Sequence, residues 1–180
     1  GGLGPDIDQG RLALAGDSSG ANLALAALLA RRGAVAAAGA ALFYGCYAPD
    51  FETASHVALG DGRFLLSTAR MRWYWRNFLG EAPFETRSLA APLRADLRGL
   101  PPLYLGAAGL DPLRDDTLVL SGRLAAAGIE HRLDVVPGVV HGFLRMAREL
   151  PAARRAVAAG GAWLAMRLKT RPMGGSEDEA

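Results

Sequence analysis

The chain has 180 residues, 51% hydrophobic and 21% charged, a composition typical of a protein that folds around one core. Its net charge is only +2 and its basic residues form no cluster, which argues against nucleic acid as a partner. A single cysteine, Cys46, excludes an internal disulfide and a cysteine metal cluster. A lone cysteine is most often a buried apolar residue, and we expect a reducing, cytoplasmic location.

Membrane insertion is not expected from the hydropathy pattern. The longest nearly uncharged stretch, Gly33 to Pro49, contains three glycines and is shorter than the roughly 18 apolar residues that a membrane span needs. The chain begins at Gly1 and shows no signal-peptide pattern, although an export signal upstream of Gly1 stays open.

The first third of the chain predicts a strand, a helix and a second strand. Residues 11–16 form a short apolar run of strand length, and residues 20–32 form a helix that is apolar nearly all round. Residues 35–44 make the second apolar run of strand length. A helix of this kind needs cover on most of its sides.

Residues 47–90 differ from simple crossover material because they hold most of the chain's aromatic side chains. Within them, residues 67–79 predict a helix with Ser67 as its N-cap and Gly80 just past its end. Its apolar stripe, Met71, Trp75 and Phe78, is typical of core packing, while a role in lining a ligand pocket stays open.

The second half repeats the alternation of strand and helix. Strands are predicted at 103–108 and 132–136, and helices at 112–127 and 151–168. Such alternation favours an α/β fold with a mostly parallel sheet between two layers of helices. We expect one domain over residues 1–170 and a disordered tail over 171–180, where the apolar period ends.

The sequence Gly16-Asp17-Ser18-Ser19-Gly20 matches G-x-S-x-G between the first predicted strand and its helix. In this context the glycines allow a sharp turn that lifts the serine out of the sheet toward the helix N-terminus. An ordinary turn, or a loop that holds a phosphate, would have the same composition. The strand before and the helix after favour a nucleophile, with the backbone N–H of Ser19 as an oxyanion donor.

A nucleophile of this kind needs an acid and then a histidine, each after a later strand. Asp111 follows the strand at 103–108, and His141 follows the last predicted strand. Asp111 also precedes Pro112, so it suits the N-cap of the next helix, and a loop histidine is often only solvated. Three signals in the right order favour a Ser18–His141–Asp111 triad.

The other titratable residues lack such a context. Asp115 and Asp116 occupy the first turn of a predicted helix, where they favour its positive end. His56 and His131 suit surface roles better than catalysis. No metal is expected, because the chain has three scattered histidines, one cysteine and no His-Glu-x-x-His motif.

Four motifs together resemble the bacterial branch of the hormone-sensitive-lipase-like esterases, including acetyl esterases, within the α/β-hydrolase superfamily. They are GDSSGANLA, SLAAPLRADLRGLPPLYL, DPLRDD and VVPGVVHGF. The resemblance implies cofactor-free hydrolysis of short-chain or small aromatic carboxylic esters, with Ser18 as nucleophile, Asp111 as orienting acid and His141 as base. It also places the aromatic segment over the substrate, with Trp73, Tyr74 and Phe143 as candidate pocket walls.

The sequence departs from the family in lacking the upstream His-Gly-Gly-Gly loop that supplies most of the oxyanion hole. Gly4 lies too close to Ser18 for GGLG to replace that loop. We therefore expect the C-terminal part of a longer enzyme, weakly active alone, with residues 12–15 as an exposed edge strand. Small residues, Ser19 and Ala21, replace the family's common alanine and glycine.

The residues leave other functions open. A non-catalytic ligand-binding module on the same fold, or a short inactive protein, would not need an intact triad. A serine amidase, peptidase or acyltransferase would use the same triad on a different leaving group. The expected partner is a small ester, and the sequence leaves a homo-oligomer open.

Overall fold

Four parallel strands form one sheet in the order β1–β2–β3–β4 in the computed structural model, which describes residues 11–80 and 89–169. The strands are β1 (Leu12–Asp17), β2 (Ala37–Phe43), β3 (Leu103–Leu110) and β4 (His131–Val140). The central strands β2 and β3 are apolar and mostly buried. This is the pattern of parallel strands that are covered on both faces.

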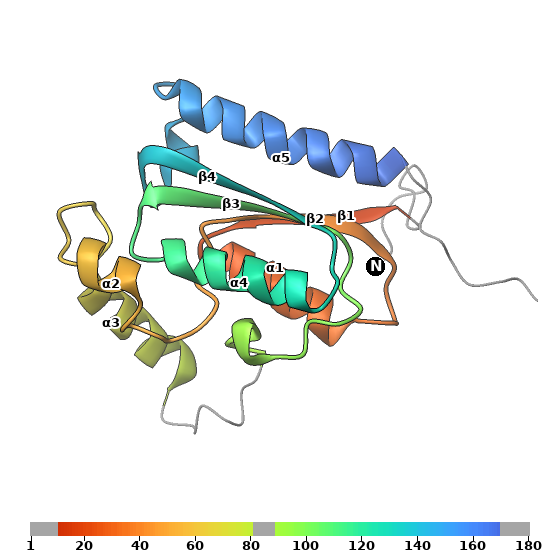
Figure 1. The fold of residues 1–180 in the computed structure, drawn as a ribbon, viewed down its shortest axis with the longest axis horizontal. Coiled ribbons are helices and arrows are strands. Elements are labelled where there is room, and N and C mark those ends of the chain that lie inside the picture. Colours follow the sequence, from red (N-terminus) through yellow and green to blue (C-terminus); the bar gives the residue numbers. More distant parts are fainter. Residues whose placement is uncertain (1–10, 81–88, 170–180) are drawn as a thin grey trace, which may run out of the picture.

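Helices cover both faces of the sheet, which confirms the α/β fold with three layers (Figure 1). Helices α1 (Ser19–Ala30) and α4 (Arg114–Ala126) pack on one face, and α5 (Pro151–Lys169) packs on the other. Each face has its own core cluster. Leucines of α1 and α4 meet those of β2 and β3 on one side, and Phe43 and Tyr104 meet α5 on the other.

The aromatic segment lies beyond the carboxyl end of β3 (Figure 1). It contains α2 (Ala54–Leu59) and α3 (Thr68–Leu79), followed after the undescribed residues by the short 3₁₀ helix η2 (Pro92–Arg94). The N-cap prediction is confirmed, since the Ser67 side chain accepts a hydrogen bond from the N–H of Arg70. Gly80 ends the helix with φ of 61°, a conformation that glycine adopts readily.

The predicted apolar stripe of α3 serves both expected roles, since all three residues line the pocket described below and two of them also pack in a core cluster. Met71 and Trp75 are buried in a small third cluster with Leu113, whereas Phe78 is 51% exposed. The helix at 20–32 is also less covered than its composition suggests, because Leu23 is 58% exposed. Both exposed side chains face the pocket described below.

Some helices and strands begin or end at residues other than those predicted from the sequence, because the local sequence signals there are misleading. Strand β4 continues through Pro137 and Gly138 to Val140, although this dipeptide predicts a turn. Within the described residues β4 pairs only with β3, and an edge strand tolerates proline because one side of it needs no ladder bonds. Helix α2 was not predicted. The predicted tail at 171–180 lies outside the described residues.

No helix in the described ranges combines the length and hydropathy needed to cross a membrane.

Candidate active site

The candidate site lies where the parallel strands end. Ser18 directly follows β1, Tyr44 follows β2, Asp111 follows β3 and His141 follows β4. Parallel strands direct all their carboxyl ends to one edge of the sheet, which is where open α/β sheets bind ligands. Side chains that are far apart in the sequence therefore meet here.

Ser18 occupies a strained turn between β1 and α1. Its φ of 54° and ψ of −122° lie outside the regions that non-glycine residues commonly adopt. Backbone hydrogen bonds hold it there: its N–H donates to the Phe43 carbonyl at 2.9 Å, and its own carbonyl accepts from Ala21 at 3.1 Å. This is the geometry that a G-x-S-x-G motif produces between a strand and a helix.

Gly16 allows β1 and α1 to approach closely. A Cβ atom on Gly16 would lie 2.3 Å from the carbonyl oxygen of Gly20, a distance that no side chain can occupy. Around Gly20 itself no described heavy atom lies within 4 Å of the corresponding position. The first glycine of the motif is thus required by packing, whereas packing among the described residues does not require the second.

A chain of hydrogen bonds joins the three residues predicted to form a triad. Ser18 Oγ lies 2.9 Å from His141 Nε2, and His141 Nδ1 lies 2.7 Å from Asp111 Oδ2. Asp111 is fully buried, and its second carboxylate oxygen accepts the N–H of Leu113 at 2.9 Å. Both oxygens of the buried carboxylate therefore have donors, as a buried charge requires.

Asp111 does not cap α4 in the way the sequence suggests. The helix begins at Arg114, Leu113 is its N-cap, and no side chain caps it. The Asp111 side chain instead bonds the backbone two residues ahead and leaves its other oxygen to His141.

Asp17 and Ser19 flank the serine and have different surroundings. The Tyr44 hydroxyl donates to Asp17 Oδ2 at 3.1 Å, and the Tyr44 and His141 rings pack edge-to-face with their centroids 5.0 Å apart. Ser19 is the first residue of α1, so its N–H has no carbonyl acceptor one turn earlier.

A pocket of about 690 Å³ opens over Ser18 and His141. Its walls come from α1, the loop after β2, the segment leading into α3, α3 itself and the loop after β4. The lining residues are Asp17, Ser18, Ser19, Asn22, Leu23, Cys46, Leu65, Leu66, Arg70, Met71, Tyr74, Trp75, Phe78, His141, Gly142 and Arg145.

Of the three candidate wall residues, only Tyr74 lies among these. Trp73 is 54% exposed and packs against Tyr74, with their ring centroids 5.2 Å apart. Phe143 is fully buried in the core beneath α5, next to Tyr44. Its position two residues after His141 places it in the 3₁₀ helix η3 (Phe143–Met146), which turns the side chain inward.

Two buried polar residues, Asn22 and Asp116, hold the loop after β2 in place, a role that sequence reasoning missed. The Asn22 amide donates to the carbonyls of Cys46 and Ala90. The Asp116 carboxylate accepts the N–H groups of Tyr47 and Ala48 at 2.7 and 3.3 Å, and burial raises its pKa to about 7. An asparagine within an otherwise apolar helix was the available signal for the first of them.

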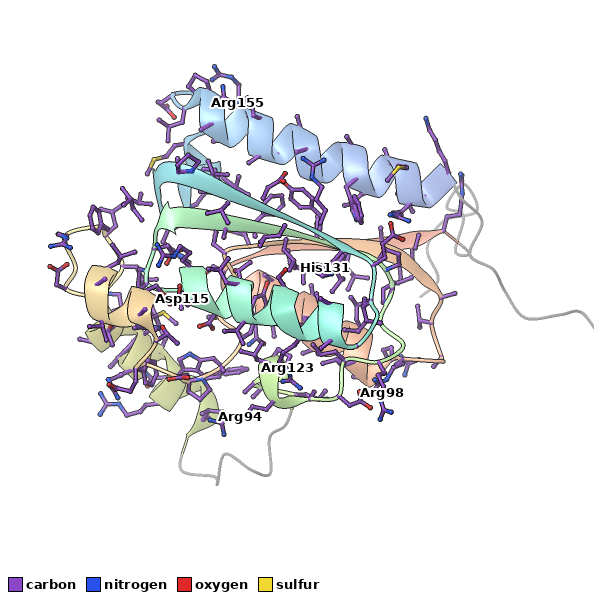
Figure 2. The ribbon with its side chains drawn as sticks, in the orientation of Figure 1. Arg94, Arg98, Asp115, Arg123, His131 and Arg155 are labelled. Atoms are coloured by element: carbon purple, nitrogen blue, oxygen red, sulfur yellow. The ribbon has the colours of Figure 1, made fainter. Side chains whose placement is uncertain are left out.

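Asp115 also has a tertiary partner, since it accepts the N–H of Ser55 at 2.8 Å and so ties α2 to the start of α4 (Figure 2). The expected surface role of His56 is wrong: the side chain is buried, its Nδ1 lies 2.8 Å from Thr68 Oγ1, and burial lowers its pKa. His131 begins β4 at the opposite end of the sheet from the site, with its Nε2 2.9 Å from Ser121 Oγ.

Within the described ranges no three histidine, cysteine, aspartate or glutamate side chains come together as metal ligands would. Cys46 borders the pocket, and burial raises the pKa of its thiol to about 12. A thiol with such a pKa is protonated at neutral pH and is a poor nucleophile.

Comparison with known proteins identifies the family of the chain. The family model of the α/β-hydrolase fold matches residues 4–145. Carboxylesterase NlhH of Mycobacterium tuberculosis is 36% identical over 158 residues, covering 85% of this chain and 50% of that protein. An acetyl-hydrolase of Streptomyces hygroscopicus is 37% identical over 160 residues, covering 86% of this chain and 52% of that protein.

Solved structures of esterases have the same fold over most of this chain. A thermostable esterase from Pseudomonas putida superposes with a TM-score of 0.84 at 33% identity, covering 89% of this chain and 52% of that one. An esterase of the bacterial hormone-sensitive lipase family superposes with a TM-score of 0.83 at 31% identity, covering 91% of this chain and 55% of that one. The chain spans about half the length of these relatives. It belongs to the α/β-hydrolase fold family, in the branch that contains the bacterial hormone-sensitive-lipase-like esterases.

Proposed function

We propose that this chain carries the catalytic machinery of a serine carboxylesterase that hydrolyses short-chain or small aromatic esters. The observation that carries the proposal is the hydrogen-bonded chain from Ser18 Oγ through the His141 ring to Asp111. The names of the relatives, carboxylesterase and acetyl-hydrolase, support the same reaction class.

In this proposal Asp111 fixes the tautomer of His141. With its proton on Nδ1, His141 donates a hydrogen bond to the Asp111 carboxylate, and Nε2 is left as an acceptor for the Ser18 hydroxyl. The buried carboxylate also stabilises the imidazolium that forms when Nε2 takes the proton. Leu113 N–H and the strand end at Leu110 keep the carboxylate in place.

The reaction then proceeds in two halves. Ser18 Oγ bonds to the ester carbonyl carbon while its proton passes to His141, and the alcohol leaves with that proton, giving an acyl-serine. A water molecule next gives a proton to His141 and attacks the acyl carbon. The acid leaves and the proton returns to Ser18.

The backbone N–H of Ser19 is the oxyanion donor that this chain would supply. It lies beside the nucleophile and at the positive end of α1, where a developing negative charge is favoured. One oxyanion donor contributes about 2.7–4 kcal/mol to transition-state stabilisation in enzymes where it has been removed.

Pocket size and lining support small esters. A volume of about 690 Å³ suits a small ligand, and most of the wall is apolar. Leu23 and Phe78, exposed on their own helices, present hydrocarbon to this space and would bind an alkyl chain or an aromatic ring.

Hydrolysis of p-nitrophenyl acetate and butyrate tests the proposal, with the matched p-nitroanilides as amide substrates. Ester hydrolysis at least 10³-fold faster than hydrolysis by the Ser18→Ala variant is expected, because the uncatalysed background contains no acyl-serine step. Ser55→Ala is the matched control, since Ser55 is a buried serine that bonds Pro112 and lies outside the pocket lining. Faster turnover of the anilides would favour an amidase, and equal rates for wild type and Ser18→Ala would contradict a serine hydrolase.

A further inference from the structure

The pocket over Ser18 contains two guanidinium groups that its proposed reaction does not use. Arg70 lies in the first turn of α3, and Arg145 lies in η3 after His141. The lining includes one carboxylate, Asp17, which accepts the Tyr44 hydroxyl. Among the described residues no carboxylate forms an ion pair with Arg70 or Arg145. The pocket therefore has an excess of positive charge.

Arg145 is held close to the base. Its Nη2 lies 3.0 Å, and its Nε 3.4 Å, from the position that a Cβ on Gly142 would occupy. Gly142 follows His141 directly and has φ of 74°, so the chain turns there and the Arg145 guanidinium lies against the turn. The backbone N–H of Arg145 donates to the Gly142 carbonyl at 3.1 Å, which fixes the start of η3.

The position of Arg145 indicates which part of an ester it would meet. His141 returns its proton to the leaving oxygen, so the alcohol portion must lie on the side of the pocket next to the imidazole. A charged group on that portion would come near the Arg145 guanidinium. Arginine binds carboxylates through two parallel N–H donors, and Arg145 is exposed, so its guanidinium is accessible to such a group.

We propose that the pocket selects esters whose alcohol portion carries a carboxylate, with Arg145 as the main binding group and Arg70 as a second positive charge. This inference rests on the proposed esterase function and adds a substrate class to it. An acetate ester of an aromatic hydroxy acid combines the required features: a small acyl group, a ring for the apolar wall and an anion for Arg145.

The test compares 3-acetoxybenzoate with neutral 3-acetoxybenzamide, which differ in charge while the acetate is the one ester bond in each. The measured quantity is the ratio of their kcat/KM values, so that the intrinsic reactivity of the two esters cancels between protein variants. In Arg145→Gln the ratio should fall by about fivefold, the size expected for a partly exposed ion pair, and 1 M NaCl should reduce it in the wild type. Arg70→Gln should lower it less.

Arg148→Gln and Arg76→Gln are the matched controls, because each lies near one of the two arginines but outside the pocket lining. Both should leave the ratio unchanged. A wild-type ratio that Arg145→Gln does not alter would overturn the inference, while hydrolysis of 3-acetoxybenzamide to the phenol would leave the proposed function standing.

If neither ester is hydrolysed, a binding measurement distinguishes failure of the proposed esterase function from failure of the inferred carboxylate preference. The analogues 3-acetamidobenzoate and 3-acetamidobenzamide contain no ester bond, and calorimetric titration gives their dissociation constants. Preferential binding of the anion that Arg145→Gln reduces about fivefold would support the cation site even though the proposed function had failed. Equal binding of 3-acetamidobenzoate and 3-acetamidobenzamide would overturn the inference.

Discussion

At the scale of single residues, Tyr44 connects two parts of the candidate site. Its hydroxyl donates to Asp17 next to the nucleophile, and its ring packs edge-to-face with the His141 ring. Burial raises the pKa of Tyr44 far above its ordinary value, with Asp17 adding to the shift. The hydroxyl therefore remains a donor throughout the pH range in which an esterase operates, and the side chain holds both Asp17 and His141 in place.

Removing only the hydroxyl of Tyr44 tests this positioning role. Tyr44→Phe should lower kcat for p-nitrophenyl butyrate by about tenfold and leave KM nearly unchanged, because the ring remains while the Asp17 bond is lost. The free energy of unfolding should fall by about 1 kcal/mol. Tyr74→Phe removes a hydroxyl from an exposed pocket residue and serves as the control. Equal kcat values for the two variants would refute the role.

The three residues of the proposed triad could be identified from sequence because each signal is local. A motif marks Ser18, and a strand end precedes both Asp111 and His141. Tyr44, Asn22 and Asp116 could not be identified in this way, since their roles depend on partners 24 to 69 residues away along the chain. The inward position of Phe143 likewise depends on the turn at Gly142.

At the scale of secondary-structure elements, the junction of β1 and α1 depends on Gly16. A methyl group there would overlap the Gly20 carbonyl, and moving that carbonyl would shift the first turn of α1 together with Ser18. Gly122 provides the comparison, because it lies in helix α4 with no described neighbour within 4 Å of a Cβ.

Alanine at these two glycines should have opposite effects on stability. Gly16→Ala is expected to lower the free energy of unfolding by about 2 kcal/mol or more, as overpacking does. Gly122→Ala should raise it by roughly 0.5–1 kcal/mol, the propensity difference in a helix. Urea unfolding followed by circular dichroism measures both, and a stable Gly16→Ala protein with a reactive Ser18 would contradict the close approach.

Asp116 makes the attachment of the loop after β2 to α4 sensitive to pH. Burial raises its pKa from 3.8 to about 7, so between these values the folded state holds a proton that the unfolded state releases. The stabilisation is thus fully present below about pH 4 and is lost as the pH rises through about 7.

The pH dependence can be isolated by comparison with Asp116→Asn, which cannot titrate. Between pH 4 and pH 8 the wild type should lose about 2–4 kcal/mol of unfolding free energy relative to this variant. Because the other ionisable groups are shared, their titration cancels in the difference. If the unfolding free energies of the two proteins changed in parallel with pH, burial would not raise the pKa of the Asp116 carboxyl group.

Most helices and strands could be predicted because each has its own signal, such as the Ser67 cap and Gly80 end of α3. The extension of β4 through Pro137 could not be predicted, since it depends on that strand's place in the sheet. Helix α2 is six residues long, too short for a periodic pattern, and depends on Thr53 as its cap and on the contact of Ser55 with Asp115.

At the scale of the whole molecule, the parallel sheet places the site by joining four strand ends at one edge. β1 pairs only with β2 among the described residues, and Leu12 is 41% exposed, as expected for an edge strand. The order of strands and helices could be predicted from sequence, and with it the meeting of Ser18, Asp111 and His141. The pocket wall could not be predicted from sequence, because it combines side chains from several separate segments.

The most direct test of the account is whether Ser18 in this chain is an activated nucleophile. The purified chain would be treated with a fluorophosphonate, and the modified residue located by mass spectrometry, with Ser18→Ala as control and circular dichroism to verify folding. We predict a single phosphonylated site at Ser18 that is absent from the control, because His141 removes the hydroxyl proton. A folded chain that reacts no faster at Ser18 than at its other serines would contradict the proposed triad.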